Sequence, residues 1–202
     1  MNYTFSMGLP KLVKRYTPQE YYELEREAEY KSDYYQGEIF AMAGGTKSHS
    51  RICSNISQQL GNRLEGTNCV NYQSDLRVKV KATGLRTYPD ASVFCGPMEA
   101  DPEDPAGQTY TNPAVLFEVL SKTTEAYDRG LKCEHYRRIE SLNTIVLLWQ
   151  KEPRARIYER QQDGSWLARE VSGMDSILPI ASLEVEVPLA KLYDQVDFNA
   201  KE

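Results

Sequence analysis

Residues 114–120 most strongly limit how this chain can fold. Their sequence, AVLFEVL, is apolar at every position except Glu118, which is typical of a strand that is buried on both faces. A helical pattern at about 124–140 and a second apolar run at 144–150 follow along the chain. This order predicts two parallel strands joined by a crossover helix, so we expect an α/β fold with the 114–120 strand near the centre of its sheet.

Capping signals predict two helices in the first third of the chain. Thr17, Pro18 and Glu20 match a capping box with proline at the first helical position, so a helix is expected at about 17–31. Thr46 is the expected cap of a second helix, whose apolar residues recur at helical spacing to about residue 65.

Alternating and apolar patterns predict strands in much of the remaining chain. At 75–81, charged and apolar side chains alternate strictly, which predicts a strand with one solvent-exposed face and one packed face. A loop rich in proline and aspartate is expected at 96–113, and a helix from about residue 188. Further short strands are expected at about 34–42, around a Gln36–Gly37 turn, and at about 88–95, 154–161, 166–171 and 175–187.

The composition is that of an ordinary globular protein. The 202 residues are 41% hydrophobic and 26% charged, which excludes the disordered, collagen-like, coiled-coil and disulfide-scaffold classes. We expect one domain at 17–202 after a loose arm at 1–16. No apolar run approaches the roughly 18 residues of a membrane span, so a soluble cytoplasmic protein without a membrane partner is expected. The four cysteines form no CxxC pair, and a chain of this length needs no disulfide, so neither a disulfide nor structural zinc is expected.

Acidic residues outnumber basic ones, 29 to 24, and the formal net charge is −5. This balance argues against extensive non-specific coating of nucleic acid, although a local basic patch can still contact phosphates. Arg77, Lys79 and Lys81 share one face of the predicted 75–81 strand, with Arg86 beyond the next turn, and are the candidates for such contacts. A solvated strand face that discourages edge pairing explains the same pattern equally well.

Glu118 is the most informative candidate for chemistry. Burying an ionised carboxylate without a partner costs several kcal/mol, so a cation, strong donors or a raised pKa must compensate, or the residue lies at the strand end beside an Arg or Lys. Asp90 follows Pro89 early in the preceding strand. Two carboxylates on neighbouring strands suit Mg²⁺, whereas a solvated aspartate in a Pro-Asp turn is the simpler alternative for Asp90.

Lys132 is the candidate cation for the same site. On the predicted crossover helix, Asp128, Lys132 and Tyr136 form one stripe at i, i+4 spacing beside the apolar stripe. This stripe can present the ammonium group to Glu118 and Asp90, although a surface salt bridge with Asp128 is the simpler alternative. Treated as an exposed helix residue, Lys132 is expected to be replaceable by alanine without loss of the fold but with loss of cleavage.

The combined motifs resemble a large bacterial family, abundant in cyanobacteria, that is named putative restriction endonuclease and belongs to the PD-(D/E)XK nuclease superfamily. The resemblance covers about residues 16–195 and rests on Tyr34, Tyr35, Gln36, Gly37, Glu38, Pro89, Asp90, 117–121, Thr124, 127–130, Lys132 and Tyr136. It implies a restriction endonuclease-like fold, with a mixed central sheet flanked by helices and a β-rich C-terminal extension. It also implies that Asp90 and Glu118 are metal ligands. The residue two after Glu118 is Leu120 rather than lysine, so the resemblance assigns the lysine role to Lys132 on the following helix.

Two further residues are candidates for the site. The resemblance implies that Glu38 supplies another acidic ligand, while a glutamate in a surface turn is the alternative. His49, at the start of the second helix, can reach a phosphate or a metal-bound water, or can be a partly buried structural histidine. His135 continues an apolar stripe and is expected to be structural.

These observations lead to the hypothesis of a Mg²⁺- or Mn²⁺-dependent endonuclease that hydrolyses phosphodiester bonds of nucleic acid, with DNA as the expected partner. Asp90, Glu118 and Glu38 would hold the metal, and Lys132 would orient the attacking water. The carboxylates of Asp90 and Glu118 are expected within about 6 Å of each other. A non-catalytic nucleic-acid or protein interaction module is the alternative, and a metal-dependent hydrolase of another phosphate ester is a third. A homodimer is expected if both strands of a duplex are cut.

Overall fold

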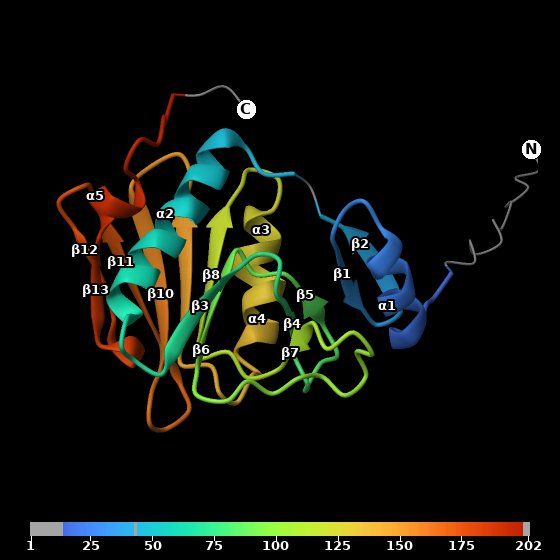
Figure 1. Ribbon diagram of the computed structural model, residues 1–202. Coiled ribbons are helices and arrows are strands. Elements are labelled where there is room, and N and C mark those ends of the chain that lie inside the picture. Colours follow the sequence, from blue (N-terminus) through green and yellow to red (C-terminus); the bar gives the residue numbers. More distant parts are fainter. Residues whose placement is uncertain (1–13, 43, 200–202) are drawn as a thin grey trace, which may run out of the picture.

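The computed structural model describes residues 14–42 and 44–199, so most of the expected arm at 1–16 lies outside the described residues. The larger sheet holds its strands in the order β11-β10-β9-β8-β6-β3 (Figure 1). β8 and β9 run parallel, and every residue of β8 is buried, which confirms the predicted pair of parallel strands around a crossover. The strands of this sheet are β3 (Cys69–Gln73), β6 (Ala91–Cys95), β8 (Val115–Leu120), β9 (Thr144–Trp149), β10 (Arg154–Arg160) and β11 (Trp166–Ser172).

A second sheet carries the N-terminal hairpin, in the order β2-β1-β5-β4-β7. In the hairpin turn, Gln36 and Gly37 have φ of 49° and 85°, the positive values that a type I′ turn needs, so the predicted hairpin is confirmed. The strands of this sheet are β1 (Ser32–Tyr35), β2 (Glu38–Ala41), β4 (Arg77–Lys79), β5 (Arg86–Thr87) and β7 (Thr109–Tyr110). A separate pair is formed by β12 (Ile177–Ile180) and β13 (Val185–Pro188). The result is a mixed α/β fold with two mixed sheets and few helices.

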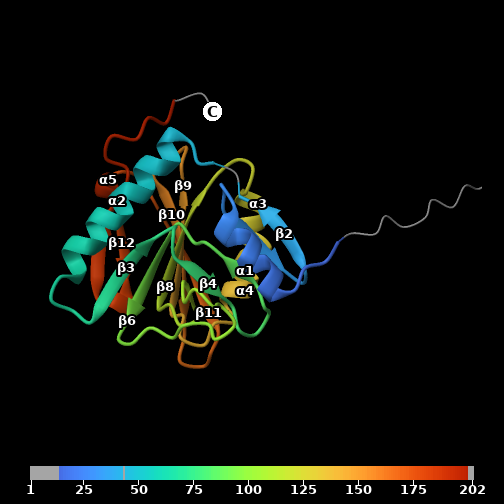
Figure 2. The same ribbon diagram turned by 45° about the vertical axis from the view of Figure 1, so that its right-hand side comes forward.

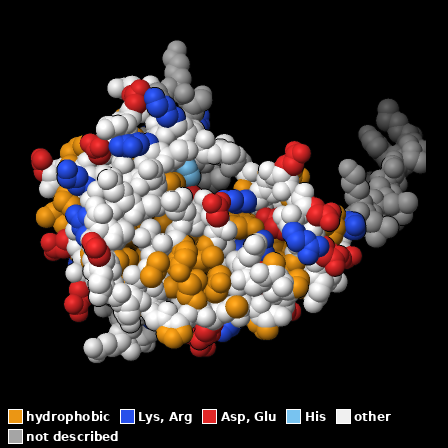
Figure 3. Space-filling view, viewed as in Figure 1, with side chains coloured by type: hydrophobic (Ala, Val, Ile, Leu, Met, Phe, Trp, Pro, Cys, Tyr) orange, Lys and Arg blue, Asp and Glu red, His pale blue; other side chains and the backbone are white. Residues whose placement is uncertain are grey.

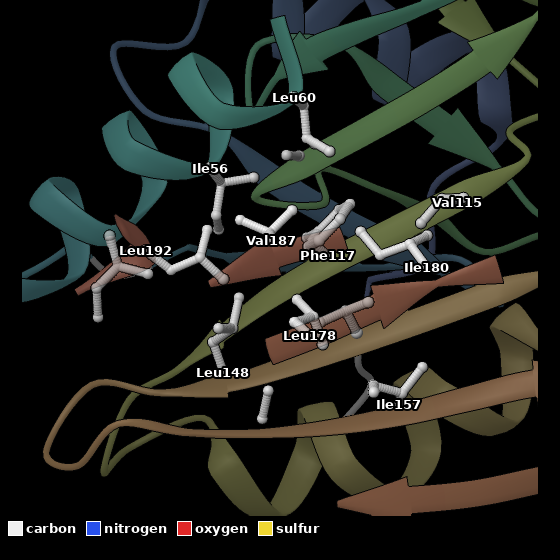
Figure 4. Close-up of a cluster of buried hydrophobic side chains, with 14 of the residues drawn as sticks. Ile56, Leu60, Val115, Phe117, Leu148, Ile157, Leu178, Ile180, Val187 and Leu192 are labelled. Atoms are coloured by element: carbon white, nitrogen blue, oxygen red, sulfur yellow. The ribbon is translucent and has the colours of Figure 1, made fainter. Parts of the chain in front are cut away.

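The helix predicted from Thr46 is α2 (Lys47–Leu64), and the Thr46 side chain accepts a hydrogen bond from the backbone N–H of His49, as a cap should. α2 crosses one face of the six-stranded sheet (Figures 1 and 2). Its Ile56 and Leu60 belong to the same buried core as Phe117 of β8, which Figure 4 shows together with side chains of β12, β13 and α5 (Leu189–Leu192).

The first helix, α1 (Pro18–Glu27), begins with the predicted capping box, because the side chains of Thr17 and Glu20 each accept the other residue's backbone N–H. It ends four residues earlier than predicted, since the chain becomes extended at Ala28 and turns into β1. α1 packs on the hairpin through its tyrosines, and the rings of Tyr21 and Tyr34 are 5.0 Å apart.

The crossover between β8 and β9 contains the helix predicted at 124–140, but the helical residues span only 125–136 and include a π-helical turn. It consists of α3 (Glu125–Tyr127), a π-helical turn η1 (Asp128–Lys132) and α4 (Cys133–Tyr136). Gly130 lies inside η1, and glycine weakens a regular α-helix by about 1 kcal/mol relative to alanine. This segment covers the face of the larger sheet opposite α2, and single π-helical turns of this kind are frequent at functional sites.

The charged face of the 75–81 strand is exposed to solvent only at its two ends, Asp75 and Lys81, and is covered at Arg77 and Lys79 between them. Arg77 in β4 is only 6% exposed, and its Nη1 lies 3.0 Å from the Thr109 hydroxyl oxygen of β7. Lys79 Nζ lies 2.8 Å from Asp101 Oδ1. The acidic loop after β6 folds over the middle of this face, so Arg77 and Lys79 have partners inside the protein, whereas Lys81 pairs with Glu99 at the surface.

The cysteines also differ from the expectation. Cys69 and Cys95 are directly opposite each other in the β3–β6 pair and form a disulfide, which the strand register makes possible although 26 residues separate them in sequence. Cys53 and Cys133 are free thiols. Among the described residues, no helix has the length and apolar character that crossing a membrane requires.

Candidate functional site

A cavity of about 830 Å³ lies where the N-terminal hairpin, the start of α2, the end of β8 and the turn η1 meet. We call it the site cavity. Figure 3, which views this side of the molecule, shows a histidine with acidic and basic side chains near it between the larger part of the protein and the hairpin. The titratable residues that line the site cavity are Asp33, Tyr35, His49, Asp90, Glu118, Lys122, Tyr127, Asp128 and Lys132.

Glu118 reaches this cavity because alternate residues of β8 face opposite sides of the sheet. Phe117 and Val119 point toward the α2 core, so Glu118 points toward the crossover segment. Its Oε1 lies 2.9 Å from Lys132 Nζ and accepts a hydrogen bond of 2.5 Å from the Tyr136 hydroxyl. Glu118 is 3% exposed, and this burial raises the pKa of its carboxyl, an effect that the charge of Lys132 opposes.

Lys132 is buried as completely as its partner, with 3% of its surface exposed. Burial by itself lowers the pKa of the ammonium, but the adjacent Glu118 carboxylate raises it well above the usual range. Asp128 Oδ1 lies 3.7 Å from Lys132 Nζ. The predicted stripe of Asp128, Lys132 and Tyr136 therefore does face the sheet, but inside the protein rather than on its surface.

Asp90 lies next to Glu118 because Ala91 of β6 pairs with Phe117 of β8, and one more step of this antiparallel register joins the two acids. Asp90 Oδ2 accepts a hydrogen bond of 2.7 Å from the backbone N–H of Val119. Asp90 and Glu118 both line the site cavity. Their expected separation of about 6 Å stays a prediction.

His49 enters the site cavity from the first turn of α2. Its Nε2 is 3.2 Å from Asp90 Oδ2, and its Nδ1 is 3.6 Å from the Cys53 sulfur. Burial alone lowers the pKa of His49, but the hydrogen bond and charge of Asp90 raise it above the ordinary value. His49 is therefore a partner of Asp90, a role that spacing along the sequence could not reveal.

The hairpin contributes Asp33 of β1 to the site cavity rather than Glu38 of β2. Within the described part of the chain, Asp33 Oδ1 is buried and has no hydrogen-bond partner, and burial raises the pKa of this carboxyl. Glu38 pairs instead with Arg15, at 3.1 Å. The sequence analysis did not select Asp33. The Gln36–Gly37 turn sets a hairpin register in which Asp33 lies directly opposite Phe40, and this register was the available signal that Asp33 shares a face with an apolar residue.

The three predicted phosphate contacts lie apart from the site cavity and have carboxylate partners. Arg77 Nη1 lies 3.6 Å from Asp104, and Lys79 pairs with Asp101 and Glu103. Lys81 is exposed and pairs with Glu99 at 2.8 Å. Arg86 is almost fully buried between Tyr22 and Glu103. His135, expected to be structural, packs edge-on against Tyr35 with ring centroids 4.6 Å apart.

Among the described residues, the site cavity has one compact group of possible metal ligands: His49, Cys53 and Asp90 offer ligand atoms within 4.8 Å of one another. Glu118 and Asp33 line the same cavity and supply hard carboxylate oxygens, which Mg²⁺ and Mn²⁺ prefer, but they are not part of a group at that spacing. Nitrogen and sulfur donors extend the range of acceptable ions toward Mn²⁺ and softer transition metals.

The mixed α/β fold of this chain is similar to that of a protein whose crystal structure has been solved. A crystal structure of a putative nuclease belonging to DUF820, from Anabaena variabilis ATCC 29413, matches with a TM-score of 0.72 and 19% sequence identity, covering 88% of this chain and 97% of that chain. At this identity the match shows a shared fold.

The sequence itself identifies the family. The Uma2 family model, described as putative restriction endonuclease, matches residues 18–190, and the chain belongs to this family. An uncharacterized protein of Synechocystis sp. (strain ATCC 27184 / PCC 6803 / Kazusa), slr1290, is 35% identical over 172 residues, covering 85% of this chain and 86% of the relative. A second Synechocystis protein, sll1609, is 29% identical over 173 residues, covering 86% of this chain and 97% of that relative. The resemblance inferred from the motifs is thereby confirmed.

Proposed function

We propose that this protein is a metal-dependent endonuclease that hydrolyses phosphodiester bonds of nucleic acid on a restriction endonuclease-like fold of the PD-(D/E)XK type. The observation that carries the proposal is Glu118, a carboxylate buried in the central strand and held by Lys132 and Tyr136 at the wall of a cavity that Asp90 also lines. A buried ion pair is costly to assemble and is a poor choice for stability alone. Its position at an open cavity supports a chemical role.

Asp90 and Glu118 would hold the metal, and we propose Asp33 as the hairpin's contribution, because it lines the site cavity and Glu38 lies outside it. When bound, Mg²⁺ or Mn²⁺ would polarise the scissile phosphate and lower the pKa of a water. The hydrogen bond from the Val119 N–H holds one Asp90 oxygen in place. This leaves the carboxylate preoriented toward the cavity.

Lys132 would stabilise the negative charge that develops on the phosphate oxygens and orient the attacking water. Its Nζ lies 2.9 Å from Glu118 Oε1, and in this proposal it acts as a positive charge rather than as a base. His49 would orient Asp90 through the contact between Nε2 and Oδ2. In this arrangement the lysine comes from the crossover segment instead of the strand that carries Glu118.

The test is a nicking assay on supercoiled plasmid and on labelled single- and double-stranded oligonucleotides, with Mg²⁺, Mn²⁺ or EDTA. The parent should cleave only with metal, and Glu118→Gln and Asp90→Asn should each lose at least about 100-fold in rate, the size of effect expected for removing an acid–base or metal-ligand group. Glu99→Gln, on the surface beside Lys81, should cleave like the parent.

A non-catalytic nucleic-acid or protein interaction module is the second candidate function. Charged side chains of the site cavity are already paired with one another, as Lys132 is with Glu118, and this favours the module if no cleavage is measured. Nucleic-acid binding without metal-dependent cleavage, at several oligonucleotide sequences, would replace the nuclease with this alternative. Cleavage by Glu118→Gln at the parental rate would remove Glu118 from the mechanism.

A further inference from the structure

One wall of the site cavity is apolar and exposed. Phe40 of β2 is 48% exposed and Leu131 of η1 is 47% exposed, although large apolar side chains are usually buried in a monomer. Tyr35 and Met42 line the same cavity. A phosphate backbone gains nothing from such a wall, whereas the flat face of a nucleobase stacks on aromatic side chains with any sequence.

The charge of the site cavity points the same way. Among its described lining residues, the acidic side chains Asp33, Asp90, Glu118 and Asp128 outnumber the lysines Lys122 and Lys132, and His49 is already paired with Asp90. Lys132 is already paired with Glu118. Duplex DNA is normally held by many contacts between cations and phosphates, and a cavity with this balance cannot supply them.

The size of the site cavity sets a further limit. At about 830 Å³ it lies within the range of small-molecule pockets, large enough for a nucleotide and far too small for a duplex. A base can enter only after it has left the helical stack, and extruding a paired base costs a few kcal/mol, which a single strand does not have to spend.

We infer that the site cavity binds an unpaired nucleobase of single-stranded nucleic acid, with Phe40 as the stacking surface, and so selects single strands over duplexes. This inference rests on the proposed nuclease function, because it concerns which nucleic acid reaches the carboxylates. Phe40 pairs across the hairpin with Asp33, so the same two strands present the base-binding face and a carboxylate.

The experiment measures binding by fluorescence anisotropy, in EDTA and at fixed salt concentration, for a labelled DNA strand, its duplex and the same strand with abasic sites. The single strand should bind at least about tenfold more tightly than the duplex, and abasic sites should remove most of this advantage. Phe40→Ala should weaken single-strand binding about 5- to 150-fold, which corresponds to about 1–3 kcal/mol of lost stacking. Phe40→Trp should restore binding.

Tyr30→Ala is the matched control, because Tyr30 is an exposed aromatic residue, 63% accessible, that does not line the site cavity. Its single-strand affinity should equal that of the parent. Circular dichroism melting of each variant verifies folding, and Phe40→Trp keeps the test decisive if Phe40→Ala unfolds.

The outcomes separate this inference from the proposed function. Equal affinity for duplex and single strand, or for abasic and intact strand, would overturn base recognition while metal-dependent cleavage could still support the nuclease. Binding of single strands that depends on Phe40, without cleavage in the presence of any metal, would support base binding in the site cavity and overturn the proposed nuclease function. Unchanged binding by Phe40→Ala would overturn the stacking role of Phe40.

Discussion

At the scale of single residues, Lys132 differs most from its sequence-based interpretation. Its helical spacing suggested an exposed side chain, whose removal normally changes stability by less than about 0.5 kcal/mol. In the folded protein it is 3% exposed and paired with Glu118. The expectation that Lys132→Ala leaves the fold intact therefore no longer holds, and loss of activity in that variant could come from loss of stability.

A double-mutant cycle tests this buried pair. Lys132→Met should lower the free energy of unfolding by about 3–5 kcal/mol, because it leaves the Glu118 carboxyl buried without its cation. Adding Glu118→Gln should recover part of that loss, since a neutral amide needs no counter-ion. Urea denaturation measures both. Lys122→Met, at an exposed lysine on the same cavity, should change stability by less than about 0.5 kcal/mol, and an equally small effect of Lys132→Met would contradict the buried pair.

At the scale of elements, the first turn of α2 positions His49 in the site cavity. The Thr46 hydroxyl has two roles there, because it accepts the His49 backbone N–H and donates to Gln150 Oε1 at 2.7 Å. Gln150 follows β9 directly. This one side chain therefore ties the helix start to the end of the central parallel strands. The cap was predictable from the sequence, but its second partner 104 residues away was not.

Removing this hydroxyl should loosen the start of α2. Thr46→Val loses the cap, worth about 0.5–2 kcal/mol, and leaves the buried Gln150 side chain without its donor. We expect a fall of about 1–3 kcal/mol in the free energy of unfolding and faster amide hydrogen exchange at His49. Thr46→Ser keeps the hydroxyl and should remain close to the parent. Similar exchange rates in the valine and serine variants would count against this connection.

At the scale of the whole molecule, the site cavity depends on segments that are distant in sequence. Asp33 comes from β1 of the smaller sheet, Glu118 comes from β8 of the larger sheet, and Asp90 directly precedes β6. Lys132 comes from the crossover. The unfolded chain cannot hold these carboxylates around one ion. A cation that binds them therefore binds the folded state and stabilises the entire fold.

Metal should raise the melting temperature of the parent. At about 100 times its dissociation constant, Mn²⁺ or Mg²⁺ should add about 2.7 kcal/mol, or about 5–11 °C for a chain of this size. Differential scanning calorimetry with and without EDTA measures the shift. Glu118→Gln and Asp33→Asn should reduce it, whereas Glu38→Gln, outside the site cavity, should keep it. A parent that shows no shift up to millimolar Mn²⁺ would argue strongly against the metal.

A single-strand substrate would also change what is expected of the assembly. Nucleases that cut both strands commonly pair two sites by two-fold symmetry, which was the reason to expect a homodimer. A site that takes one unpaired base at a time needs no second copy. The predicted homodimer therefore depends on a duplex substrate. The preference for single strands over duplexes, measured with the Phe40 variants, tests both expectations.

Local chemistry determined much of this protein from its sequence alone. The apolar run around Glu118, the capping residues Thr17 and Thr46 and the Gln36–Gly37 turn each act through neighbouring residues, so the strand, both helix starts and the hairpin were predictable. The same holds for Glu118 as a candidate, because a carboxylate inside an apolar run is anomalous wherever the strand lies.

Tertiary structure alone decided which charged groups became buried partners. Asp33 rather than Glu38 entered the site cavity, and Arg77 was covered by the acidic loop. Cys69 met Cys95 through strand register. Each of these outcomes depends on which distant segment packs against a residue. Periodicity reports only whether a side chain shares a face with its neighbours in sequence, and the identity of the opposite face is set by the packing of the whole chain.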